Sequence, residues 1–148
     1  MSGRVACVPG FTETAVQNAL VTAAESSGRF LALVAPPYGL TTAQEAVLWH
    51  DGNLLRTGDR TTALNSSYAA CYWPWLQVFN PFTAADEWLD PVIFAARTLA
   101  NTDAIADPWI APAGMQRGRL TKPNNVEVTL QQGDRDHLYG NGAAVNPI

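Results

Sequence analysis

The side chains that could do acid–base chemistry lie close together in one segment of the chain. Asp86 and Glu87 are adjacent, and Asp90 follows shortly after them. Paired carboxylates cleave sugars only when they face each other across a substrate, whereas sequence neighbours point in different directions. We therefore expect Asp86 and Glu87 to lie in a solvated loop that leads to Asp90. A small α/β enzyme with its site near this pair is the alternative.

The two histidines, His50 and His137, are the candidate metal ligands. Asp134 and His137 are spaced so that one helix face could present both side chains. A metal site needs three or four converging ligands, and the sequence offers no third ligand near this pair. Acidic residues at a helix N-terminus are explained without metal, because they interact favourably with the helix dipole. We expect no metal and no other cofactor.

Motifs for nucleotide binding and for nucleophilic catalysis are absent. Pro9-Gly10 follows an apolar run where a dinucleotide-binding turn would lie, but a single glycine cannot form the glycine-rich loop. No phosphate-binding loop of the Gly-x-x-x-x-Gly-Lys type occurs. Ser66-Ser67 lacks the flanking glycines of a nucleophile elbow. No catalytic residue is predicted.

Charge and cysteine usage exclude several classes of partner. The 148 residues carry a formal net charge of -4, and only 15% of them are charged, against about 25% in a typical protein. The one basic cluster, Arg117, Arg119 and Lys122, predicts a solvated loop rather than a nucleic-acid site. Cys7 and Cys71 lie in apolar runs and predict buried free thiols. With no secretory leader and no membrane-length apolar run, we expect cytoplasmic synthesis and no membrane insertion.

Residues 66–81 concentrate the aromatic side chains in one apolar segment. No charged residue occurs between Arg60 and Asp86. Both alternating faces of residues 68–73 are apolar, which predicts a central strand that is covered on both sides. Pro74 has no N–H to donate, so we expect strand pairing to stop or bulge there.

The rest of the chain alternates between predicted strands and helices. Apolar runs predict further strands at residues 5–8, 29–35 and 126–130. Cap residues predict helices that begin at Thr12, Thr42, Asp90 and Asp134. In the first helix, the residues that follow a helical period are Val16, Leu20, Ala23, Ala24 and Ser27. This alternation predicts a single α/β layered domain over residues 1–148, with a mainly parallel or mixed sheet flanked by helices.

Four motifs, taken in order, resemble the core of contractile-tail sheath proteins, a family of phage tail sheaths and sheaths of bacterial contractile injection particles. The motifs are the strand and Tyr-Trp-Pro-Trp element at 68–75, the proline-led helix at 91–103, the turn at 111–114 after a tryptophan, and the ending at 145–148. The residues that carry the resemblance are Tyr68, Tyr72, Pro74, Trp75, Pro91, Asp103, Trp109, Pro112 and Asn146.

The resemblance implies a structural role without catalytic residues or cofactors. Sheath subunits stack in helical rings around an inner tube, and their contraction drives the tube through a target envelope. Extended terminal arms donate strands to neighbouring subunits. The implied partners are other sheath subunits and the inner tail tube protein. The implied location is the virion tail, which is assembled in the cytoplasm of a host bacterium.

The family core also continues beyond the asparagine-centred ending. We therefore expect this sequence to be the central part of a sheath core that is truncated at the C-terminus, as a fragment, a truncated gene product or one part of a split sheath. Its bare sheet edge is then a predicted pairing site or an aggregation liability. A carbohydrate- or protein-binding module is the remaining alternative, and it requires Trp73, Trp75 or Trp88 to face solvent. The enzyme alternative requires a deep pocket that converges on Asp86, Glu87 or His137.

Overall fold

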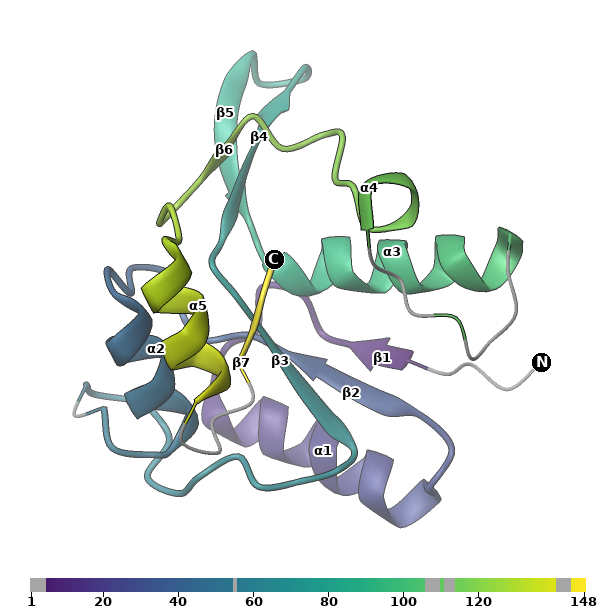
Figure 1. Cartoon of the computed structure of the whole chain (residues 1–148). Helices are drawn as coiled ribbons and strands as arrows, with labels where there is room; N and C mark the ends of the chain where they lie inside the picture. The colour runs from purple at the N-terminus through teal and green to yellow at the C-terminus, as the bar shows by residue number, and fades with distance from the viewer. Residues whose placement is uncertain (1–4, 55, 106–109, 111–113, 141–144) are drawn as a thin grey trace.

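A parallel four-stranded sheet forms the centre of the structure, a computed structural model that describes residues 5–54, 56–105, 110, 114–140 and 145–148. Its strands are β1 (Val5–Cys7), β2 (Leu31–Val34), β3 (Ala69–Trp73) and β7 (Val145–Pro147), in the order β1-β2-β3-β7. Each neighbouring pair is parallel. The predicted α/β fold is confirmed, and β3 lies inside the sheet as the aromatic run indicates (Figure 1).

Helices cover both faces of this sheet. Figure 1 shows α1 (Thr14–Ser27) and α3 (Pro91–Ile105) on opposite sides of β1 and β2. α2 (Ala43–His50) and α5 (Gln132–Tyr139) join α1 in covering one large apolar cluster. Successive residues of β2 alternate between the clusters, since Ala32 and Val34 belong to the large one and Leu33 to the one beneath α3. Burial on both faces explains why this strand is continuously apolar.

A second, antiparallel sheet begins just after Pro74. β4 (Leu76–Asn80) pairs with both β5 (Ala85–Leu89) and β6 (Asn125–Val126). The Trp73–Pro74 peptide bond is cis, and β3 ends at Trp73. The expected end of pairing at Pro74 is therefore confirmed. In Figure 1 the hairpin of β4 and β5 rises away from the parallel sheet.

Two expectations are wrong because the sequence did not reveal this hairpin. Asp86 and Glu87 do not lie in a solvated loop; they are residues of β5, which β4 orders by antiparallel pairing. Residues 126–130 do not form a strand of the main sheet, since only Val126 and its neighbour Asn125 are in β6 and they pair with β4. β7 takes the fourth place in the parallel sheet instead.

Three helix termini match the expected caps and two differ. Gly28 ends α1 in the left-handed conformation at φ 61°. Thr42 accepts a hydrogen bond from the Glu45 N–H at the start of α2, and Asp90 begins α3. The N-cap of α1 is Glu13 rather than Thr12, and no side chain caps this terminus. Asp134 is the third residue of α5 and forms a reciprocal capping box with Gln131, rather than being the cap itself.

The buried face of α1 includes only part of the residues that follow the helical period in the sequence. Gln17, Val21 and Ala24 are buried, whereas Ala23 and Ser27 are exposed. Gln17 is buried because its Nε2 donates a hydrogen bond of 2.7 Å to the Ala35 carbonyl. An apolar period cannot reveal a buried polar anchor of this kind. Among the described residues, no helix is both long and apolar enough to cross a membrane.

Candidate functional site

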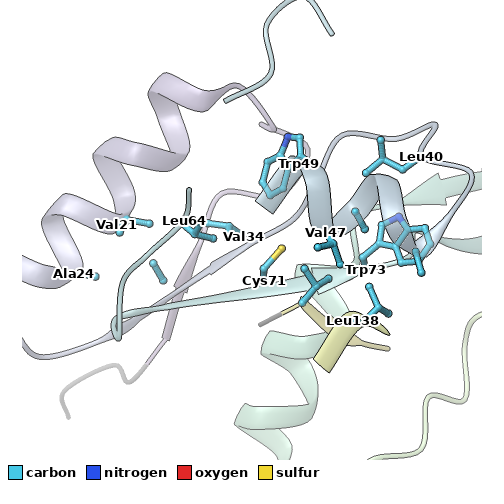
Figure 2. Close-up of a cluster of buried hydrophobic side chains, with 14 residues drawn as sticks. Val21, Ala24, Val34, Leu40, Val47, Trp49, Leu64, Cys71, Trp73 and Leu138 are labelled. Carbon is cyan, nitrogen blue, oxygen red and sulfur yellow. The ribbon is translucent and has the colours of Figure 1, made fainter. Parts of the chain in front are cut away.

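The central strand β3 carries the aromatic motif into the core. Trp73 is 0% exposed and belongs to the large cluster under α1, α2 and α5. Figure 2 shows Trp73, Leu40, Val47 and Leu138 gathered at one end of this cluster. Tyr72 packs instead against the cluster beneath α3, and burial raises the pKa of its hydroxyl. The strand thus joins the two layers of the molecule through alternate side chains.

Trp75 is held at the junction of the two sheets. Its indole Nε1 donates a hydrogen bond of 2.9 Å to the Pro36 carbonyl, and the side chain is 9% exposed. Tyr38 packs edge-on against Trp75 at 5.7 Å and tilts against Trp88 at 5.6 Å, between ring centroids. The binding-module alternative needed solvent-facing tryptophans; Trp73 and Trp75 do not meet this requirement, and Trp88 is half-buried.

Glu127 fastens the same junction, although the sequence did not single it out. Its carboxylate accepts hydrogen bonds from the Gly39 N–H at 2.6 Å and the Trp75 N–H at 3.4 Å. Its own N–H donates to the Trp75 carbonyl at 2.9 Å. Burial raises the pKa of this carboxyl. The only available signal was its position as a lone acid between Val126 and Val128.

Asn146 links the last strand to the central one. Its Nδ2 donates a hydrogen bond of 3.1 Å to the Cys71 carbonyl, and it stands opposite Tyr72 in the parallel register. An asparagine suits this position because its side-chain amide can donate to a backbone carbonyl while its backbone N–H remains available for strand pairing. The interaction is a structural reason for the asparagine-centred ending.

Replacing Asn146 with alanine should lower the free energy of unfolding by about 1 kcal/mol, the usual net value of one hydrogen bond. Asn146→Asp should cost more, because a carboxylate cannot donate and would face the Cys71 carbonyl oxygen. Urea denaturation of the two variants measures the difference. Equal stability of all three proteins would show that the amide does not hold β7 on β3.

Asp90 joins two segments that are far apart in the sequence. Its Oδ1 accepts a hydrogen bond from the Val92 N–H and its Oδ2 one from the Gly10 N–H, both at 2.9 Å. The carboxylate therefore begins α3 and also holds the turn that follows β1. Burial raises the pKa of Asp90, against the smaller opposite effect of these two hydrogen bonds. Burial, and next the charge of Asp90, raise the pKa of the Cys7 thiol.

The raised pKa of Asp90 gives a pH dependence with a definite sign. On acidification the folded protein takes up this proton before the unfolded chain does, so protonation favours the folded state. The Asp90 contribution to stability is therefore complete below the ordinary value of 3.8 and is lost as pH rises through the folded-state pKa. The free energy of unfolding relative to Asp90→Asn should fall with rising pH across this window in urea titrations. A difference that rises across it would contradict the assignment.

The carboxylates Asp86 and Glu87 stabilise the hairpin by hydrogen bonds to separate partners. Glu87 Oε1 accepts hydrogen bonds from Asn80 Nδ2 at 2.9 Å and Thr83 Oγ1 at 3.0 Å. Asp86 Oδ1 accepts one from Asn124 Nδ2 at 2.8 Å. As consecutive residues of β5 they point to opposite faces of the sheet. Their observed partners give them structural roles.

The remaining candidate residues belong to different segments of the chain. Pro91 is the buried first residue of α3, Asp103 is exposed near its end, and Tyr68 is 38% exposed just before β3. Trp109 and Pro112 lie outside the described residues. Within the part of the chain that the structure describes, no three histidine, cysteine or acidic side chains gather as metal ligands. His50 pairs with its neighbour Asp51 at 3.0 Å, distant in sequence from His137.

Among the strands that the structure describes, β7 is at an edge of the parallel sheet, and apolar grooves lie on both of its faces. One groove, of about 460 Å³, is lined in part by Val128, Leu130 and Tyr139. The other, of about 220 Å³ and on the side of α3, is lined in part by Tyr72, Ala95, Leu99 and Leu120. Pro147 and Ile148 line both grooves.

The backbone of β7 limits how its free edge can pair. The Ile148 N–H donates to the Trp73 carbonyl at 3.2 Å, so this residue faces β3. Because alternate residues of a strand face opposite neighbours, Pro147 faces the free edge. Proline has no N–H, and the edge therefore offers mainly carbonyl groups and apolar side chains there.

The chain is similar to two curated proteins, both named tail sheath protein. It is 25% identical over 144 residues to that of Enterobacteria phage T4, in a match that spans 93% of this chain and 21% of the phage protein. It is 28% identical over 85 residues to that of Vibrio phage KVP40, spanning 57% of this chain and 12% of the relative. No protein-family model matches it.

The chain thus spans about a fifth or less of the length of the curated relatives it matches. The match to the T4 protein extends over nearly all of the sequence. The chain is similar to phage tail sheath proteins, and the resemblance expected from its sequence motifs is confirmed.

Proposed function

We propose that this chain is part of a structural subunit of a contractile tail sheath. In this role it polymerises around an inner tube, and contraction of the assembly drives the tube through a target envelope. The observation that carries the proposal is the similarity to the T4 tail sheath protein across 93% of the chain. Residues 1–148 would form one domain, the central part of a larger sheath core.

The contacts of the polar side chains support a structural role rather than an enzymatic one. Asp86, Glu87 and Asp90 all accept hydrogen bonds that fasten backbone segments or the hairpin. Glu127 does the same at the junction of the two sheets. In this proposal the protein has no catalytic residue and needs no cofactor. Its partners are other sheath subunits and the inner tail tube protein.

The free edge of β7 is the proposed pairing surface for a strand from another sheath subunit. An added strand would run beside Val145–Pro147 and place alternate side chains into the two grooves. Because Pro147 donates no hydrogen bond, burial of apolar side chains in the grooves would supply much of the stabilisation. This surface would lie opposite β1, the other edge strand of the parallel sheet.

Immunogold electron microscopy tests the proposal most directly. Antibodies raised against this chain would be applied to contractile particles from cells that carry its gene. Gold should decorate the outside of the tail along its whole length in extended particles, and follow the shortened sheath after contraction. Because the proposed sheath is assembled in the bacterial cytoplasm, tail labelling should be seen only on particles whose tails have already been assembled there.

Two outcomes would contradict this function. Label restricted to the capsid or baseplate would assign the chain to another particle component. Tailed particles from a strain lacking the gene that still contract normally would show that the sheath does not need it. Antiserum depleted on the purified chain is the control for specific labelling.

A further inference from the structure

Arg60 is a buried cation that lacks an acidic partner in the described part of the chain. It is 2% exposed, and neither of the ion pairs found among the described residues involves it. Its guanidinium lies 4.6 Å from the centre of the Trp49 ring, a favourable cation–π distance. Burial lowers the pKa of Arg60. Burying an ionised group without an opposite charge is costly, so this arrangement requires an explanation.

Few of the donors of this guanidinium are used. Nη2 donates only long hydrogen bonds, to Gln17 Oε1 at 3.5 Å and to Asn18 Oδ1 at 3.4 Å. Nε is buried and has no partner among the described residues. The Gln17 amide is fixed by its bond to the Ala35 carbonyl, so its oxygen cannot turn away. Since a guanidinium has five N–H donors, most of them have no hydrogen-bond partner among the described residues.

A polar pocket lies beside this unused group. It measures about 260 Å³ and is formed between α1 and the segment that precedes β3, with Arg60 as part of its wall. The other lining residues are Asn18, Val21, Thr22, Glu25, Thr62, Ala63, Leu64, Asn65 and Ser66. Several of the lining residues carry hydroxyl or amide groups. These groups can donate hydrogen bonds to the oxygen atoms of an anion that a single arginine contacts only on one side.

We propose that this pocket is a carboxylate-binding site in which the bound anion pairs with the Arg60 guanidinium. A planar carboxylate matches the guanidinium fork, and the hydroxyls of Thr22, Thr62 or Ser66 can donate to its second oxygen. A monoanion fits better than a phosphate dianion, because the pocket contains one cation and Glu25 adds a negative charge to its wall. The site does not depend on the proposed sheath function. The carboxylate can come from a side chain of another subunit or from a free small acid.

A titration of the purified chain with sodium acetate tests the site. The Arg60 Nε–H resonance and the backbone amides of Thr62 and Ser66 are followed by nuclear magnetic resonance, with sodium chloride at equal ionic strength as the control. Saturable shifts are expected with acetate and not with chloride. Arg60→Gln should abolish them, whereas Arg56→Gln, in the exposed part of the same segment, should leave them unchanged. Glu25→Gln should tighten acetate binding by removing a repulsive charge.

The wild-type titration decides the matter even where Arg60→Gln fails to fold. Shifts that are linear in salt and equal for acetate and chloride would overturn the proposal. Tighter binding of inorganic phosphate than of acetate would overturn the assignment to a carboxylate. Where Arg60→Gln keeps the circular dichroism spectrum of the folded chain, particles carrying it distinguish the sources: lost tail incorporation supports a side chain of a neighbouring subunit, and normal incorporation with lost acetate binding supports a free acid. A chain that binds acetate but is absent from tails would contradict only the proposed function.

Discussion

Trp73→Ala should remove about 3–5 kcal/mol from the free energy of unfolding, a large part of the stability of a domain of this size. Trp73 is 0% exposed and lies in the large cluster with Leu40, Val47 and Leu138. Truncation would remove its transfer free energy and leave a cavity between the central sheet and the helices. Because β3 pairs with both β2 and β7, the neighbouring strands cannot close this space without losing their register.

Two further variants separate the loss of packing from other causes. Trp73→Phe should lower the free energy of unfolding much less, because phenylalanine keeps most of the ring. No hydrogen bond is lost either, since the Trp73 Nε1 has no partner among the described residues. Phe79→Ala, at a side chain 55% exposed in the hairpin, should change stability by less than about 0.5 kcal/mol. Urea denaturation followed by circular dichroism measures all three. Comparable losses for Trp73→Ala and Phe79→Ala would mean that β3 is not the centre of the core.

The central strand was predictable because its pattern has a single reading. A run in which both alternating faces are apolar must be covered on both sides, and Ala69–Trp73 is paired and covered in that way. Pro74 marked the end of pairing for an equally local reason, the missing N–H. In α2 the buried residues Ala43, Ala46 and Val47 are apolar and follow the helical period, so this face can also be recognised in the sequence. Local chemistry determined each of these features.

The hairpin was not predictable from the same kind of reasoning. Asn80 and Pro81 end the apolar segment of the sequence, whereas in the structure Asn80 is the last residue of β4 and Pro81 begins the short connection to β5. The acidic pair looked solvated because its partners, Asn80, Thr83 and Asn124, are polar side chains whose positions depend on the folded hairpin. A strand with exposed and half-buried residues lacks the apolar alternation that would reveal it.

In the candidate site, too, some residues could be recognised from local sequence pattern and others only from the tertiary structure. The motif residues Tyr72, Trp75 and Asn146 were named from their sequence pattern, and each has a definite contact in the structure. Arg60 and Glu127 were not predicted as anchors, since a single charged side chain has no periodic signal, either in a polar segment (Arg60) or within an apolar run (Glu127). Their importance depends on burial, which only tertiary structure creates.

Gly52→Ala should be almost as damaging as loss of the core tryptophan, and for a backbone reason. Gly52 follows α2 at φ 74°, and a Cβ built there would lie 2.5 Å from the Thr62 N and 2.6 Å from the Thr62 carbonyl carbon. Backbone atoms cannot move aside as a flexible side chain can. The left-handed conformation costs about 1–2 kcal/mol for alanine and overpacking about 1–3 kcal/mol more. A total loss of about 2–5 kcal/mol is expected in urea denaturation.

Gly58→Ala is the matched control, because Gly58 has φ 92° in the same segment but nothing within 4 Å of its added Cβ. It should show only the conformational cost of about 1–2 kcal/mol. Equal losses for the two variants would mean that the close approach to Thr62 contributes nothing. The two variants also test the carboxylate pocket. Thr62 lines this pocket, and Arg60 lies two residues before the Thr62 backbone that Gly52→Ala would displace. Gly52→Ala should therefore weaken the acetate response even under conditions where it remains folded, while Gly58→Ala preserves it. Gly52, which is outside the pocket, would then determine the position of the buried Arg60 through the backbone alone.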